Sequence, residues 1–200
     1  MALLKKAVAC GGLLPVGRRL CAAFCVFAAS LSLAGADAPA QAPISKENVL
    51  KAVFLFDFAQ FLKWPAHAFP EAQSPIVIGV LGEDPFGAYL DGLVQGEKIG
   101  ERPMLVRRFH RAEDVSECHI LFISRSEASR LGKDLALMKG RSILTVGDMD
   151  GFNHQDGMVQ FATEDGKIQL RINVGAAKAA ELTISSKLLS HAVIVTSDKE

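Results

Sequence analysis

Two short, continuous runs of apolar residues, 76–81 and 118–123, constrain the fold of this chain most strongly. A strand that is apolar on both sides is buried on both faces, which is typical of a parallel sheet covered by helices. Residues 104–109 and 142–146 are predicted as further strands. Segments with helical periodicity lie between these strands, so strand and helix alternate along the chain.

Local signals mark where the intervening helices begin. Asp84, followed by Pro85, is expected to cap the helix after the first strand. Ser124, with Glu127 three residues later, fits a capping box before the next helix, and Ser126 is the alternative cap.

The second half of the chain departs from this alternation. Residues 158–163 and 167–172 alternate apolar and polar side chains around a turn, which predicts an antiparallel hairpin. A last helix is predicted over residues 174–189, before a short final strand. The predicted fold is a single α/β domain at residues 44–197, with a mainly parallel central sheet flanked by helices and a late antiparallel β-hairpin.

The amino terminus has the composition of a secretory signal peptide. Residues 1–36 contain four basic residues and no acidic one, and the apolar run 20–33 is followed by Ala34, Gly35 and Ala36. This run is shorter than the roughly 18 residues that span a bilayer, so we expect export, cleavage near Ala36 and no integral membrane anchor after processing. Residues 37–43 are small and proline-rich, and are expected to form a flexible lead-in.

Processing changes the charge and the cysteine content of the chain. The whole chain has 22 basic and 22 acidic residues, so the mature chain has 18 basic against 22 acidic residues, a net charge of −4. A mildly acidic surface without a basic stripe argues against nucleic acid as a partner. Cys118 is the only cysteine left after cleavage, which excludes an intramolecular disulfide.

Residues 51–65 hold four phenylalanines and the only tryptophan. They are predicted to form a helix that runs from about residue 46 to Pro65 and is apolar nearly all round, so that it is buried on more than one side. One stripe of this helix consists of Leu50, Phe54, Phe58 and Phe61. The residues left to meet water are Lys51, Ala59, Gln60 and Lys63.

The predicted sheet can cover only one side of this helix. Phe54, Phe58 and Phe61 are therefore assigned to the core, whereas Phe56, Lys63 and Trp64 are predicted to contact another chain. Asp57 interrupts the apolar stripe, and an unpaired buried carboxylate is costly. Two interpretations of Asp57 remain open: a salt bridge or partly exposed edge within the domain, or a contact with a partner.

The sequence contains no recognisable catalytic or metal-binding constellation. The histidines are His67, His110, His119, His154 and His191, which stand at least nine residues apart. His119 follows Cys118 in a predicted strand, so the two side chains point to opposite faces and cannot easily act together. We therefore predict no enzymatic activity, no metal and no cofactor.

Open parallel sheets bind ligands in the crevice beyond the carboxyl ends of their strands. The candidate ligand-binding residues at those ends are Gly82, Asp84, Ser124, Arg125, Asp148 and Phe152. Helix capping and turn formation are the alternative roles for these residues. Arg125 is the one that capping explains least, because a cation at a helix amino terminus opposes the helix dipole, and it would suit a site that faces an anion.

Taken together, five segments of the chain resemble the YfiR-like family of periplasmic proteins. These are residues 51–65, 78–87, 118–123, 144–148 with Gly151 and Phe152, and 184–189. The resemblance covers nearly all of the mature chain, in order and with family-like spacing. In place of a family-type Tyr-Asn pair in the first helix, this chain has Phe56 and Asp57. Disulfide regulation cannot be carried over to a chain with Cys118 alone.

The resemblance implies a periplasmic α/β protein without known enzymatic activity. By analogy with the best understood relative, it would bind and repress the periplasmic sensor domain of an inner-membrane diguanylate cyclase, or of a sensor kinase, and so lower cyclic di-GMP and biofilm formation. The alternative is a periplasmic small-molecule binding protein that uses the crevice at the strand ends. The exposed apolar surface of the first helix also leaves a homodimer open.

Overall fold

The computed structural model describes residues 44–196. The predicted signal peptide (1–36), its cleavage near Ala36, the lead-in (37–43) and residue 197 lie outside the described residues. Within residues 44–196, no helix is both long enough and apolar enough to cross a membrane.

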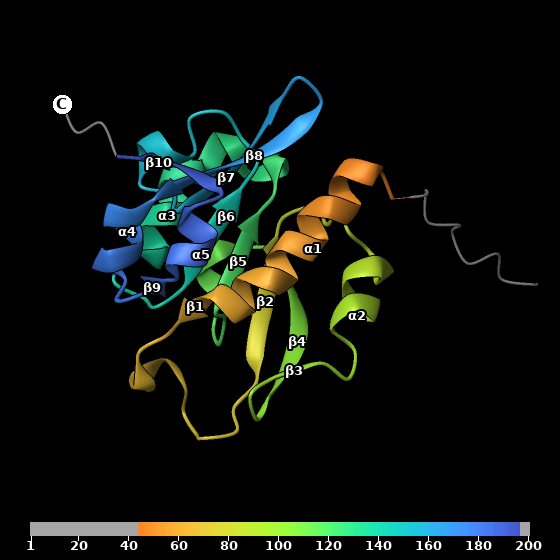
Figure 1. Cartoon of the computed structure of the whole chain (residues 1–200), viewed down its shortest axis with the longest axis vertical. Coiled ribbons are helices and arrows are strands. Elements are labelled where there is room, and N and C mark those ends of the chain that lie inside the picture. The colour runs from red at the N-terminus through yellow and green to blue at the C-terminus, as the bar shows by residue number, and fades with distance from the viewer. Residues whose placement is uncertain (1–43, 197–200) are drawn as a thin grey trace, which may run out of the picture. The chain divides into compact units, whose positions relative to one another are not determined.

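An eight-stranded mixed sheet forms the centre of the domain (Figure 1). The order of its strands in space is β10-β8-β7-β6-β5-β2-β4-β3. In chain order they are β2 (Ile76–Leu81), β3 (Lys98–Ile99), β4 (Arg102–Phe109), β5 (Ile120–Ile123), β6 (Leu144–Gly147), β7 (Val159–Glu164), β8 (Lys167–Asn173) and β10 (Ala192–Val195). Strands β4, β2, β5, β6 and β7 run parallel, and β8 pairs antiparallel with β7. The predicted α/β domain with a mainly parallel sheet and a late hairpin is confirmed.

Helices cover both faces of the sheet. Every residue of β2, β5 and β6 is buried, which explains why these strands are almost entirely apolar on both sides, with Thr145 of β6 as the polar exception. On one face lie α1 (Lys46–Phe61), α2 (Ala88–Val94), α4 (Val174–Ala179) and α5 (Ser186–Leu189). On the other face lie α3 (Leu131–Met138) and the 3-10 segments η2 (Ala112–Asp114) and η4 (Asn153–Gln155).

Two cores result from this arrangement, because neighbouring side chains of a strand point to opposite faces. In β5, Ile120 and Phe122 belong to the core under α1, and Leu121 and Ile123 belong to the core under α3. The helix α1 contacts β2 and β5 and has α2 beside it (Figure 1).

The prediction that the aromatic helix continues to Pro65 is wrong. Helix α1 begins at its cap Ser45, whose side chain accepts a hydrogen bond from Asn48 N, and it ends at Phe61. The next two residues form β1 (Leu62–Lys63), which pairs antiparallel with β9 (Thr183–Ile184). A tertiary pairing with a segment 120 residues away thus ends the helix before the proline is reached.

The predicted final helix over residues 174–189 is also wrong as a single element. It is divided into α4, β9 and α5. Glu181 adopts a left-handed backbone conformation with φ of 57°, which an α-helix cannot continue. This break lets β9 turn back and pair with β1.

The predicted caps of the middle helices differ from those observed. Ser124 makes no side-chain capping bond, and the segment after it is the 3-10 helix η3 (Arg125–Arg130) rather than an α-helix. Asp84 does cap a turn, because its Oδ1 accepts a hydrogen bond from Phe86 N at 2.8 Å. The helix α2 itself starts later, at Ala88, after Gly87 with φ of 51°.

Candidate functional site

One side of α1 is buried against the sheet. Its buried residues are Lys51, Ala52, Leu55, Phe58 and Ala59. The predicted core stripe is therefore only partly correct, since Phe58 is fully buried, Phe54 and Phe61 are partly buried, and Leu50 is 44 % exposed. The prediction that Lys51 and Ala59 meet water is wrong.

Lys51 is buried because it has two carboxylate partners. Its Nζ donates to Asp148 Oδ2 at 2.6 Å and lies 2.7 Å from Glu47 Oε1. The ammonium group of Lys51 holds the pKa of Glu47 below its usual value. The Lys51–Asp148 pair connects α1 to the end of β6. In the sequence, the only local sign that Lys51 is paired is Glu47, which lies four residues before it on the helix.

Arg125 reaches the same carboxylate from the other side. Its Nη2 donates to the backbone oxygen of Asp148 at 2.6 Å, and its Nε lies 3.8 Å from Asp148 Oδ1. The structure thus brings together Arg125 and Asp148, which the sequence predicted at the ends of neighbouring strands. The anion that Arg125 faces is a side chain of its own domain, and the two cations of the cluster, Lys51 and Arg125, are balanced by Glu47 and Asp148.

The crevice between β2 and β5 is filled by η3. A Cβ atom added to Gly82 would lie 2.3 Å from Ser126 Oγ and 2.7 Å from Glu127 Oε1, so only glycine fits at this position. Ser126 Oγ also accepts a hydrogen bond from Glu83 N at 3.0 Å. Ser124, at the start of η3, is itself buried.

The two remaining predicted ligand-binding residues have structural roles here. Asp84 Oδ2 accepts a hydrogen bond from Arg108 Nε at 2.7 Å, and this ties the start of α2 to β4. Phe152 is fully buried against Gly147 and Gly157, where any Cβ atom would meet its ring at 2.5 Å or less. Ligand binding at the strand ends therefore remains a prediction, and Phe152 is not accessible to a ligand in this structure.

The predicted partner-binding residues all lie on or just beyond α1. Phe56 and Asp57 are partly buried, Lys63 is exposed and Trp64 is partly buried. Burial raises the pKa of Asp57. Among residues 44–196, the carboxylate of Asp57 has neither a hydrogen bond nor an ion pair. Within the domain, Asp57 therefore forms a partly exposed edge and not a salt bridge, and the contact with a partner stays a prediction.

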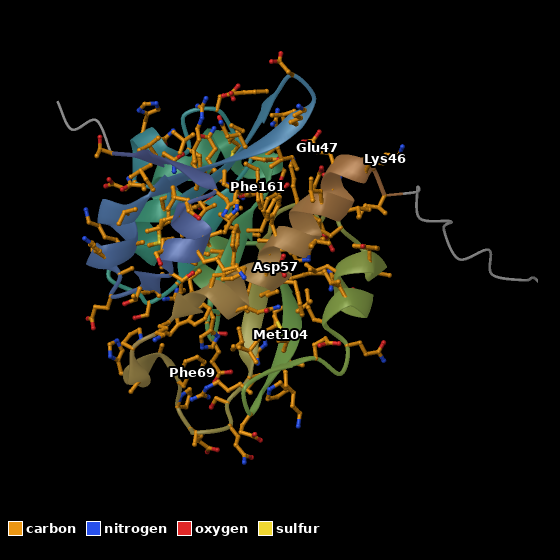
Figure 2. The ribbon with its side chains drawn as sticks, viewed as in Figure 1. Lys46, Glu47, Asp57, Phe69, Met104 and Phe161 are labelled. Atoms are coloured by element: carbon orange, nitrogen blue, oxygen red, sulfur yellow. The ribbon has the colours of Figure 1, made fainter. Side chains whose placement is uncertain are left out.

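Trp64 belongs to a stack of rings that orders the loop after α1. Its Nε1 donates to His119 O at 3.3 Å, and its ring meets those of His119 and Phe69 edge-on. Phe69 lies flat on His119, with ring centroids 4.4 Å apart, and the guanidinium of Arg102 lies 3.7 Å from the centroid of the Phe69 ring. Figure 2 labels Phe69 in the loop at this end of the sheet. Trp64 thus stabilises its own domain as well as forming part of the predicted partner surface.

His119 and Cys118 are structural residues in this arrangement. His119 Nδ1 accepts a hydrogen bond from Val77 N at 3.1 Å, so Nε2, 3.2 Å from Ala68 O, is the donor of a neutral ring. Burial lowers the pKa of His119. Burial also raises the pKa of the Cys118 thiol to about 12, so it remains protonated at neutral pH and is a poor nucleophile.

A cavity that the sequence did not predict lies at the other ends of the parallel strands. It has a volume of about 580 Å³ and lies between α3 and α4. Its walls include Leu135, Met138, Met158 and Ala176, and Thr145 of β6 also lines it. These residues come from α3, α4, β6 and the loop before β7, so no local pattern could have indicated the cavity.

In the part of the chain that the structure describes, no group of three or more His, Cys, Asp or Glu side chains is placed to hold a metal ion.

A search of curated proteins found no match. A family model described as YfiR/HmsC-like matches residues 48–193. The chain belongs to the YfiR/HmsC-like family. The match runs from the first turn of α1 into β10, so it includes both cores, the Lys51–Asp148 pair and every lining residue of the α3–α4 cavity except Thr196.

Proposed function

We propose that this member of the YfiR/HmsC-like family is an exported, non-enzymatic regulator in the periplasm. It binds the periplasmic sensor domain of an inner-membrane signalling enzyme, with a diguanylate cyclase as the first candidate, and holds that enzyme inactive. The observation that carries this proposal is the family match over residues 48–193. The neutral, buried His119 and the protonated Cys118 support a role other than catalysis.

The partner surface in this proposal is the outer side of α1 with Phe56, together with Lys63 and Trp64 just beyond the end of the helix. The inner side of α1 is already used by the sheet, whereas this side combines partly buried rings with an exposed cation. Aromatic side chains of this kind are enriched in protein interfaces. Binding would favour the inactive arrangement of the cyclase, so cyclic di-GMP and biofilm formation would fall through a shift of population.

Cellular cyclic di-GMP provides the test. Deletion of the gene is expected to raise cyclic di-GMP, and the wild-type chain is expected to restore the lower level. The variant Lys63→Glu should fail to restore it, whereas Lys98→Glu, an exposed lysine on the edge strand β3, should restore it fully. An unchanged level of cyclic di-GMP in the deletion strain would exclude a diguanylate cyclase as the regulated enzyme.

One observation favours a second candidate function, that of a small-molecule sensor. The cavity of about 580 Å³ has the size of pockets that hold small organic ligands. It differs from the predicted crevice, because it lies at the amino ends of β6 and β7 and its walls come largely from Leu135, Met138 and Ala176. In this function a ligand, rather than a partner protein, would be the primary target.

A further inference from the structure

Asp57 differs from the other acidic residues near α1. Glu47 and Asp148 both pair with Lys51, and Asp84 pairs with Arg108. Asp57 is partly buried in the second half of α1, where Figure 2 labels it. Among the described residues, no cation and no hydrogen-bond donor pairs with its carboxylate. The domain therefore removes part of the water around this carboxylate and supplies no partner in its place.

The residues around Asp57 on the same side of α1 are mainly apolar, and the exposed Gln60, three residues after Asp57, borders them. Leu50, Val53 and Phe61 lie seven residues before, four before and four after Asp57, and at 100° per residue they fall on one stripe with it. We call these four residues the outer stripe of α1. Leu50 is 44 % exposed, and Val53 and Phe61 are partly exposed. The outer stripe is thus an apolar surface with a single negative charge near its centre.

A cation of a neighbouring element lies beside the outer stripe but does not pair with Asp57. Lys187 of α5 lies with Nζ 5.5 Å from the centroid of the Phe61 ring, and no ion pair joins it to Asp57 within residues 44–196. Lys46 lies on the same side of α1 but three turns away from Asp57, and Lys63 lies beyond the end of the helix.

This arrangement restricts what can cover the outer stripe. A purely apolar surface would bury the carboxylate without a partner, which is strongly unfavourable. A second copy of the chain related by a two-fold axis near Asp57 would place two carboxylates against each other. A surface with one cation surrounded by apolar side chains would pair with the carboxylate of Asp57 and also cover the apolar residues of the stripe. Arginine suits it best, because its planar group pairs with a carboxylate in a bidentate manner and stacks on a ring such as that of Phe61.

We infer that the outer stripe of α1 is a docking surface for a protein segment that presents an arginine among apolar side chains, and that this arginine pairs with Asp57. The inference rests on the proposed function, since the segment would belong to the sensor domain of the regulated enzyme. It adds the chemical nature of the contact, and it extends the surface from Phe56, Lys63 and Trp64 to Leu50, Val53 and Phe61.

Calorimetric titration of the full mature chain tests the inference. The titrant is the periplasmic domain of the diguanylate cyclase whose output changes in the deletion strain. Asp57→Asn is expected to weaken binding about 30-fold or more, because it leaves the buried arginine of the partner without its counter-charge. Asp150→Asn, an exposed aspartate outside α1, should bind like the wild type. A charge swap completes the test. Replacement of the pairing arginine of the partner by aspartate should abolish binding to the wild type and should restore binding to Asp57→Arg.

The possible results separate the two proposals. If the wild type binds the sensor domain and Asp57→Asn binds equally well, the inference fails and the proposed function stands. If the wild type binds no sensor domain, both fail. Sedimentation gives an independent check, because a dimer that forms more strongly in Asp57→Asn would show that a second copy covers the stripe. Asp57→Asn should unfold at the same temperature as the wild type or higher, so a loss of binding cannot be attributed to misfolding.

Discussion

Two charged residues of α1 show that a charged side chain is buried only where an oppositely charged side chain pairs with it. Lys51 and Asp57 lie six residues apart on one helix, and both interrupt apolar sequence. Lys51 is almost fully buried because Asp148 and Glu47 lie within 2.7 Å of its ammonium group. Asp57 stays at the surface of the helix, since no cation of the described domain reaches it. The same type of position thus becomes an internal ion pair in one case and a candidate contact in the other.

Removal of Lys51 is expected to destabilise the domain. The variant Lys51→Met leaves the carboxylate of Asp148 without its main partner, so the free energy of unfolding should fall by about 3 kcal/mol. Urea denaturation at neutral pH measures this change. Lys98→Met, at an exposed position, should leave the free energy of unfolding within about 0.5 kcal/mol of the wild-type value.

The pH dependence of the stability of Lys51→Met provides a second test, and its direction can be predicted. The folded-state pKa of Glu47 lies below its unfolded value because of Lys51, so this contribution to stability is present above the unfolded pKa and is lost as pH falls through the folded pKa. The wild type should therefore lose more stability on acidification than Lys51→Met. Equal losses would show that the Glu47–Lys51 contact contributes nothing to folding.

At the scale of elements, β2 illustrates a constraint that the pattern of apolar residues does not show. Gly79 lies in the middle of this buried strand, and a Cβ atom there would lie 2.7 Å from Cys118 Sγ and 2.9 Å from Leu121 Cδ1. Because Gly79 has no side chain, Cys118, Leu121 and Phe109 can fill the core under α3.

The variant Gly79→Ala is expected to lower the free energy of unfolding by about 2 kcal/mol, because the added methyl group overpacks this core. Thermal unfolding or urea denaturation measures the effect. Gly92→Ala in α2 is the matched control: its Cβ atom meets nothing within 4 Å, and helix propensity predicts a gain of about 0.5–1 kcal/mol. A stable Gly79→Ala variant would show that the core under α3 can expand.

Element boundaries were predictable where local signals agreed with tertiary structure. The hairpin β7–β8 and the strands β2, β5 and β6 occur where the patterns indicate them. The ends of α1 and α4 do not, because the pairing of β1 with β9 determines both. Such a pairing between short, distant segments leaves no periodic signal in either one.

At the scale of the whole molecule, the crevice at the carboxyl ends of β2 and β5 and the α3–α4 cavity lie at different ends of the sheet. Ser126 and Glu127 fill the crevice, whereas the cavity remains open between two helices. The general rule for parallel sheets pointed to the carboxyl ends of the strands, where Gly82, Ser124 and Asp148 lie. The cavity depends instead on how α3, α4 and the hairpin assemble.

A fluorescent apolar probe, 1-anilinonaphthalene-8-sulfonate, can test whether the cavity accepts ligands. The folded wild type should enhance its fluorescence, and Ala176→Phe, which places a ring in the cavity, should reduce the enhancement several-fold. Ala128→Phe, at an exposed position of η3, is the control and should behave like the wild type. Equal fluorescence of Ala176→Phe and the wild type would mean that the probe binds elsewhere, and would remove support for the sensor function.

The sequence by itself determined the α/β class, the parallel core strands and the late hairpin, because these follow from the period of apolar residues along the chain. It also carried the family resemblance that the match over residues 48–193 confirms. Only the tertiary structure decided that Arg125 faces Asp148, that Lys51 is buried and that Asp57 has no partner within residues 44–196. The physical reason is distance along the chain: the partner of Lys51 lies 97 residues away, and a charge is satisfied by what folding brings near it.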